Sequence, residues 1–207
     1  VTEDIIVELP QSQQVVEIIS TGYCRPFTVQ PEIQKRLDGE GNTVVWQNKE
    51  IIAMETGDHT RNYYGVAIDI GTTTVVASFI DFTTGQEMAS LSCLNSQKAF
   101  GQDVISRIHY ASSNGLGGAI LQKTILQDIH FLLEDFLTER HLAPCDLVAI
   151  TIAANTTMVH LLAGQPVASL GSFPYSPAFY GPWRVKGAGW QLPVASYCPV
   201  YCLPAVA

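Results

Sequence analysis

Two apolar runs, residues 64 to 70 and 75 to 81, constrain the fold of this chain more than any other feature. Both runs are rich in β-branched residues, and only the four residues 71 to 74, Gly-Thr-Thr-Thr, separate them. Apolar, β-branched runs joined by a short polar segment are typical of two antiparallel strands connected by a turn. The sequence therefore predicts a β-hairpin, with an unusually polar turn for such apolar flanks.

The polar groups of this turn suit a phosphate ligand. Asp69 stands one residue before the end of the first run, where an apolar side chain would be more favourable, and a glycine lets a ligand approach the backbone. Backbone N–H groups and threonine hydroxyls donate to phosphoryl oxygens, whereas a carboxylate beside a phosphate requires a hard cation such as Mg²⁺ between them. We therefore predict Asp69 as a magnesium ligand, and the predicted phosphate-binding residues are Asp69, Gly71, Thr72, Thr73 and Thr74. The alternative is an ordinary hairpin in which the threonines favour strand structure and Asp69 caps the turn.

A second candidate anion site follows a later strand. Residues 146 to 153 form an apolar run, and Asn155, Thr156 and Thr157 then open a short helical pattern that stops at Gly164. The first N–H groups of a helix have no partner within the helix, so such a segment is suited to an anion. We predict that Asn155, Thr156 and Thr157 contribute to the same site. The alternative is that Asn155 or Thr156 simply caps the helix.

The remaining pattern predicts two domains of α/β type. Residues 1–62 form a small α+β module, and residues 63–207 form a larger domain that begins with the hairpin. In the module we expect four strands, at residues 4–9, 15–20, 43–46 and 50–55, and one short helix at residues 31–37. In the larger domain we expect a third strand at residues 87–93 and two helices at 103–111 and 118–142. A proline- and aromatic-rich excursion at 165–195 contains a late strand at 183–185, and a last strand follows at 200–203.

Composition excludes several functional classes. Hydrophobic residues make up 47% of the 207 residues and no apolar run approaches the length of a membrane helix, so we expect a globular protein with no membrane partner. A net charge of -8 argues against a nucleic-acid surface.

The five cysteines show no disulfide framework and no secretory signal precedes them, which predicts a cytoplasmic protein. Cys198 and Cys202 have metal-like spacing, but no second pair accompanies them, and buried thiols are the simpler interpretation.

Asp103 and Arg107 stand four residues apart at the start of a predicted helix. A carboxylate at a helix start with an (i, i+4) partner usually stabilises the helix itself. We keep a role in the site as the second interpretation of this pair. No general base can be identified from the sequence, so no catalytic residue is predicted.

Several motifs resemble one family of ATPases. The segment Asp69-Ile70-Gly71-Thr72-Thr73-Thr74 resembles the first phosphate motif of the superfamily of acetate and sugar kinases, heat-shock chaperones and actin. Residues 57–60 with 64–74, 95–108 and 154–162 together resemble the ATP-dependent reductive activators of corrinoid proteins. This chain departs from the family pattern at Ser96, where proline is usual, and at Ala154, where glycine is frequent. We expect a less rigid loop at the first position and a less approachable backbone at the second.

The resemblance implies a fold and an activity. Residues 63–207 would be one ribonuclease-H-like lobe of an actin-type ATPase domain, incomplete without a second lobe, and residues 1–62 would correspond to the linker or middle region. The full-length protein would hydrolyse ATP with Mg²⁺ and drive an electron from an iron-sulfur domain to a cobalt corrinoid on a partner protein. The resemblance also implies a homodimer and places the iron-sulfur cluster in a domain outside these residues.

Two other functions remain open at this point. A small-molecule kinase of the same superfamily would share the hairpin and would release ADP only with its substrate. A non-catalytic scaffold, in which the lobe serves dimerisation or docking, would bind no nucleotide. The 207 residues by themselves are expected to lack a complete ATPase site.

Overall fold

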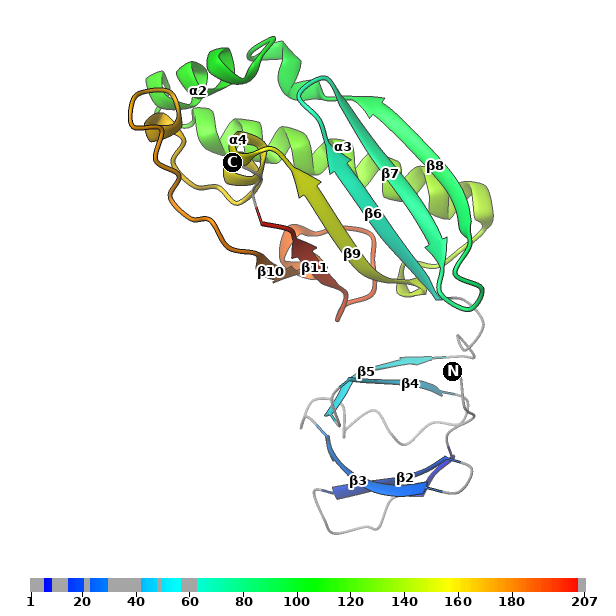
Figure 1. Cartoon of the computed structure of the whole chain (residues 1–207). Coiled ribbons are helices and arrows are strands. Elements are labelled where there is room, and N and C mark those ends of the chain that lie inside the picture. Colours follow the sequence, from blue (N-terminus) through cyan, green and yellow to red (C-terminus); the bar gives the residue numbers. More distant parts are fainter. Residues whose placement is uncertain are drawn as a thin grey trace. The chain divides into compact units, whose positions relative to one another are not determined.

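The computed structural model describes residues 63–204 in full and, before them, the backbone of five strands. The chain divides into two compact units, Val1–Tyr63 and Tyr64–Ala207. Figure 1 shows the elements of each unit coloured along the sequence. Among the helices of the described residues, none is both long and apolar enough to cross a membrane.

The first unit contains a five-stranded sheet in the order β1-β2-β3-β5-β4. The strands are β1 (Ile6–Glu8), β2 (Val15–Ser20), β3 (Tyr23–Val29), β4 (Asn42–Gln47) and β5 (Glu50–Thr56). The four expected strands are confirmed, whereas the helix expected at residues 31–37 lies outside the described residues. β3 was not expected because Pro26 interrupts it. Pro26 is paired with Glu17 of β2, and β5 pairs only with the end of β3, so the missing N–H of proline costs no ladder bond on that side.

The second unit is a mixed six-stranded sheet in the order β10-β11-β9-β6-β7-β8. The hairpin is confirmed as β6 (Tyr64–Ile70) and β7 (Thr74–Asp81), which pair antiparallel, and β8 (Glu87–Leu94) continues the meander. β9 (Leu147–Ala154) pairs parallel with β6, and β11 (Pro199–Cys202) pairs parallel with β9. β10 (Trp183–Lys186) closes the sheet antiparallel to β11.

Three helices accompany this sheet: α2 (Val104–Ser113), α3 (Gly117–Arg140) and α4 (Thr156–Leu162). α3 and α4 lie against one face of the sheet (Figure 1). The apolar stripe predicted for the long helix is confirmed, because its principal residues are buried in the structure: Leu121, Ile125, Ile129, Leu132 and Phe136. α3 ends at Arg140 and is capped by His141, which adopts a left-handed conformation and donates its N–H to the Leu137 and Thr138 carbonyls.

The core lies between these helices and the facing side of the sheet. Along β6 the buried residues Val66, Ile68 and Ile70 alternate with the exposed Ala67 and Asp69, as a strand with one covered face requires. At the centre, the rings of Phe79 and Phe136 stack with their centroids 3.9 Å apart. The helix side chains thus fix which face of the hairpin is buried, and Asp69 lies on the other face.

Replacing Phe79 by alanine tests this packing. Phe79 and Phe136 are both 0% exposed, so we expect Phe79→Ala to lower the free energy of unfolding by about 3–5 kcal/mol. Phe131 on α3 is 58% exposed, and Phe131→Ala should change stability by no more than about 0.5 kcal/mol. Chemical denaturation followed by circular dichroism measures both. Equal effects of the two substitutions would contradict the assigned core.

Candidate functional site

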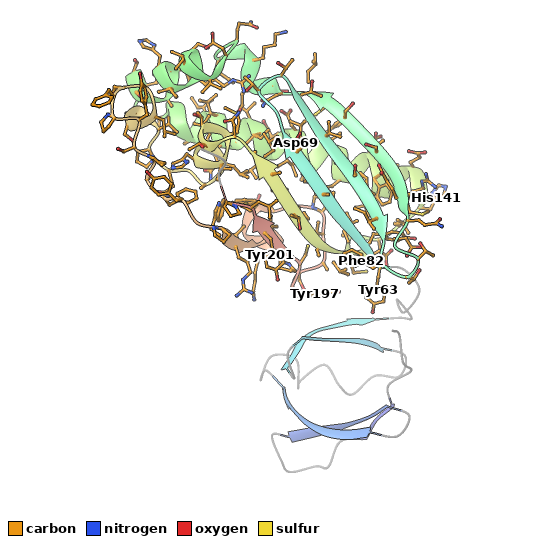
Figure 2. All side chains as sticks on the ribbon, viewed as in Figure 1. Tyr63, Asp69, Phe82, His141, Tyr197 and Tyr201 are labelled. Carbon is orange, nitrogen blue, oxygen red and sulfur yellow. The ribbon has the colours of Figure 1, made fainter. Side chains whose placement is uncertain are left out.

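The turn between β6 and β7 lies at the carboxyl end of β6. Asp69 and Thr73 are exposed, whereas Gly71, Thr72 and Thr74 are half-buried. Figure 2 labels Asp69 near the end of β6 that leads into the turn. All five residues predicted from the hairpin are therefore at least partly exposed.

All four carbonyl groups of the turn accept hydrogen bonds from the protein itself. The Asn95 side-chain amide donates to the Gly71 carbonyl at 2.8 Å, and the Asn95 backbone N–H donates to the Thr73 carbonyl at 2.8 Å. Arg107 Nη2 donates to the Thr72 carbonyl at 2.6 Å. The Gly71 N–H closes the turn on the Thr74 carbonyl at 2.9 Å. Among the described residues, the backbone N–H groups of Thr72 and Thr73 donate to no backbone carbonyl.

Gly71 has a different role from the one expected. A Cβ atom at this position would lie 2.7 Å from the Thr74 carbonyl oxygen. The space above Gly71 is therefore occupied by the turn's own backbone. The glycine permits the tight Gly71–Thr74 hydrogen bond, and the structure gives no support to the expectation that it opens the backbone to a ligand.

Arg107 is the buried cation beneath the turn. Its side chain is 0% exposed, and its guanidinium also donates to the Gly101 carbonyl at 2.9 Å and to Gln97 Oε1 at 3.2 Å. A fourth contact joins Nη1 to the Met158 sulfur at 3.4 Å. Burial lowers the pKa of Arg107, and the negative charge of Asp103 opposes this shift. Arginine nevertheless stays charged in proteins, so a positive charge lies directly behind the turn.

Asp103 has only a local role in the structure. Its carboxylate accepts the Ser106 N–H at 2.7 Å, and Ser106 Oγ in turn accepts the Asp103 N–H at 3.1 Å, which forms a capping box at the start of α2. The expected helix-start interpretation is thus confirmed for Asp103. Arg107 instead turns inward to Thr72, which the (i, i+4) spacing did not indicate.

Ser96 holds the loop before α2 more firmly than expected. Its N–H donates to Asp128 Oδ2 at 2.8 Å and its hydroxyl donates to Asp128 Oδ1 at 2.7 Å. Proline at this position would lack both donors. The expectation of a less rigid loop is therefore not supported, because a two-pronged contact with the long helix α3 constrains it.

The second predicted segment lies beside the first. Asn155 Oδ1 caps α4 by accepting the Met158 N–H at 3.0 Å, so its helix-capping interpretation is confirmed. Its Nδ2 lies 3.4 Å from Thr72 Oγ1 and donates to it. Thr156 is half-buried and Thr157 is buried. The contact of Asn155 with Thr72 joins the two predicted segments, and phosphate binding by either segment stays a prediction.

The cysteine pair does not resemble a metal site. Cys198 and Cys202 are buried, and burial raises the pKa of each thiol to about 12, which disfavours the thiolate that a metal would need. In the part of the chain that the structure describes, no group of three or more His, Cys, Asp or Glu side chains is placed to hold a metal ion. Asp69 is exposed near the end of β6, and its role as a magnesium ligand stays a prediction.

Two polar residues of this network were missed by sequence reasoning. Asn95 and Gln97 are both 0% exposed, and Gln97 joins Arg107 to the Leu121 carbonyl, with its own Nε2 donating at 2.9 Å. Both belong to a segment that the family resemblance had identified. Their polar side chains, in a segment that precedes the apolar helices, were the sequence signal that could have identified them.

Removing the Asp128 carboxylate tests the anchoring of the loop. Asp128→Ala would leave both Ser96 donors without their charged partner, and we expect a loss of about 1.5–3 kcal/mol in the free energy of unfolding. Asp135→Ala on the exposed side of the same helix is the control and should have little effect. Denaturant titration compares the two. Similar stabilities would mean that the contact does not constrain the loop.

The cap of α2 gives a pH-dependent prediction. Hydrogen bonds from the Ser106 backbone and then its side chain hold the pKa of Asp103 below its ordinary value of 3.8. A lowered folded-state pKa stabilises the protein above pH 3.8, and this stabilisation is lost as the pH falls through the folded-state pKa. We expect Asp103→Asn, which keeps the cap, to reduce the acid dependence of stability below pH 3.8. Unfolding measured from pH 6 to pH 2.5 checks this, and an unchanged slope would contradict it.

Comparison with known proteins identifies the family. The sequence model described as the RACo middle region matches residues 64–207. A solved structure titled "Reductive activator for corrinoid,iron-sulfur protein" superposes with a TM-score of 0.77 at 30% identity, over 88% of this chain and 31% of that chain.

A curated relative, the corrinoid activation enzyme RamQ of Eubacterium limosum, is 29% identical over 153 residues, which is 74% of this chain and 26% of the relative. The chain thus spans about a quarter to a third of the length of these relatives. The family model described as the middle region matches residues 64–207, and the assignment of residues 1–62 to a linker or middle module stays a prediction. This chain belongs to the family of corrinoid reductive activators that carry the RACo middle region.

Proposed function

We propose that the turn at residues 71–74 binds the phosphates of ATP in an ATP-hydrolysing reductive activator. The observation that carries the proposal is the one-sided arrangement of the turn, whose carbonyl groups all accept bonds from the protein. The N–H groups of Thr72 and Thr73, which donate to no backbone carbonyl in the described residues, and the hydroxyl of the exposed Thr73 would donate to a ligand. Such a set of donors matches phosphoryl oxygens.

The topology of the second unit supports an actin-type ATPase lobe. A three-stranded antiparallel meander opens the unit, and two further strands, β9 and β11, extend the sheet parallel to β6. This strand order is compatible with the ribonuclease-H-like arrangement expected from the sequence, and it supports the proposal. In the proposed lobe the β6–β7 turn and the start of α4 form the edge that faces ATP, because parallel strands β6 and β9 end side by side. The second lobe that completes such a site would come from the full-length protein.

The residues present fit a hydrated Mg²⁺ held by Asp69. Magnesium in nucleotide sites is bound by one or two carboxylates, by phosphate oxygens and by several waters, so a single exposed carboxylate beside the turn is sufficient. Bound Mg²⁺ would neutralise charge between the carboxylate and the phosphates. Asp69 would position it, Thr72 and Thr73 would orient the phosphates, and Asn155 would hold the Thr72 hydroxyl. Catalysis would then rest on positioning and charge stabilisation.

The similarity to corrinoid activators supports a proposal about partners. We propose that hydrolysis in the full-length protein drives electron transfer from an iron-sulfur domain to a corrinoid protein, and that the protein is a cytoplasmic homodimer. Three strongly exposed aromatic residues support a contact surface in the excursion before β10: Phe173, Tyr175 and Tyr180. The same exposure favours the second candidate function, a docking scaffold without nucleotide, and the next experiment separates the two.

Substitution of Asp69 tests the magnesium role. In the full-length protein that carries this sequence, Asp69→Asn should weaken Mg-ATP binding at least about tenfold, because one charged metal ligand is lost. Calorimetry at fixed ATP and increasing Mg²⁺ measures the effect. Asp81 lies at the other end of the same hairpin, and Asp81→Asn should leave the affinity unchanged.

Three outcomes are informative. Binding by the wild type with loss only in Asp69→Asn supports the proposal. Unchanged affinity in Asp69→Asn removes the metal role of this residue. Absence of Mg-ATP binding in the wild type favours the scaffold.

A further inference from the structure

We propose that Arg107 is a positioning residue for the polyphosphate site, acting with Asn95 through the peptide groups of the turn. The inference rests on the proposed function and adds what makes the turn a phosphate site. Neither residue reaches the ligand side. Both act from beneath, by fixing the direction in which the turn's N–H groups point.

The geometry of the peptide bond carries the first step. In a planar trans peptide the C=O and N–H groups point in opposite directions. Asn95 holds the Gly71 carbonyl from inside, which directs the Thr72 N–H outward, and Arg107 holds the Thr72 carbonyl from inside, which directs the Thr73 N–H outward. Two consecutive donors, the N–H groups of Thr72 and Thr73, therefore point away from Asn95 and Arg107.

The charge of Arg107 carries the second step. All four acceptors around its guanidinium are neutral: the Thr72 and Gly101 carbonyls, Gln97 Oε1 and the Met158 sulfur. No carboxylate lies within ion-pair distance of it in the region that the structure describes. The Asp103 carboxylate, whose charge raises the pKa of Arg107, accepts a hydrogen bond from the Ser106 N–H. A buried cation without a paired anion favours an anion on the far side of the turn.

The arrangement also requires a close approach. A Cβ atom at Gly101 would lie 2.7 Å from the Arg107 backbone nitrogen and 2.9 Å from its Cγ. The loop before α2 can therefore contact the Arg107 stem only because residue 101 is glycine. This brings the Gly101 carbonyl to Nε and fixes the plane of the guanidinium, so that Nη2 meets the Thr72 carbonyl.

The experiment compares three probes on the full-length protein: Mg-ATP, Mg-pyrophosphate and adenosine. We expect Arg107→Gln to weaken binding of Mg-ATP and of Mg-pyrophosphate by about tenfold to a hundredfold, the range of a lost charged hydrogen bond, and to leave adenosine binding within about twofold. Arg107→Lys keeps the charge and loses the planar fork, so its loss should be smaller. Arg140→Gln is the matched control, because Arg140 Nη2 also donates to a carbonyl, that of Met88 at 3.1 Å, and is exposed.

A second variant covers the case in which Arg107→Gln does not fold. Asn95→Asp keeps the acceptor for the Gln97 N–H and replaces the donor to Gly71 by an oxygen. We expect the same selective loss of polyphosphate binding. The ¹⁵N shift of Thr73 should move in the Arg107 variants even without nucleotide, because it reports the hydrogen bond at the Thr72 carbonyl.

The outcomes separate this inference from the proposed function. A wild type that binds neither Mg-ATP nor Mg-pyrophosphate overturns both. A wild type that binds them, with folded Arg107 and Asn95 variants that bind equally well, overturns only the positioning role. Lower thermal stability with unchanged polyphosphate affinity would show that Arg107 is merely structural, and equal losses for adenosine and pyrophosphate would have the same meaning.

Discussion

The structure of the second unit depends on how the buried guanidinium of Arg107 is compensated. A cation removed from water is costly unless polar groups replace its hydration. Here three oxygens and a sulfur do so, and they come from four separate segments: the turn, the loop before α2, the 3-10 helix at Ser96–Ala99 and α4. The compensation is complete only when all four segments are in place. The local conformation of the turn and the packing of the surrounding helices are therefore set by the same contacts.

The sheet brings these segments together. Thr74 at the start of β7 pairs with Leu94 at the end of β8, so the chain leaves the sheet at Asn95 directly beside the turn. On the other side, Ile70 pairs with Ala154, so β9 delivers Asn155 to Thr72. The turn thus lies between two neighbouring strand ends. Each neighbour contributes an asparagine, one holding its carbonyl groups from inside and one contacting a threonine hydroxyl.

Much of the fold could be predicted from periodicity. The hairpin, the long helix with its stripe from Leu121 to Phe136 and the apolar strand before Asn155 each carry a local pattern that the structure confirms. β3 was not predicted because a proline usually ends a strand. Pro26 is tolerated within β3 because it is paired with β2 on one side only. For the candidate site, the sequence indicated the turn and the start of α4 but not the buried Asn95 and Gln97. Arg107 was predicted as the helix partner of Asp103, because (i, i+4) spacing identifies neighbours along a helix and cannot show which side chain turns into the core.

The sequence by itself determined the elements, the polar turn and the family motifs, since these depend on residues close together in the chain. The tertiary structure decided which polar groups meet. Arg107 and Thr72 are 35 positions apart, and Asn95 and Gly71 are 24 apart. Such contacts require that the sheet and the helices bring distant segments together in a region from which water is excluded. Burial then makes each unmet donor costly, and that cost, which no local pattern records, selects the partners.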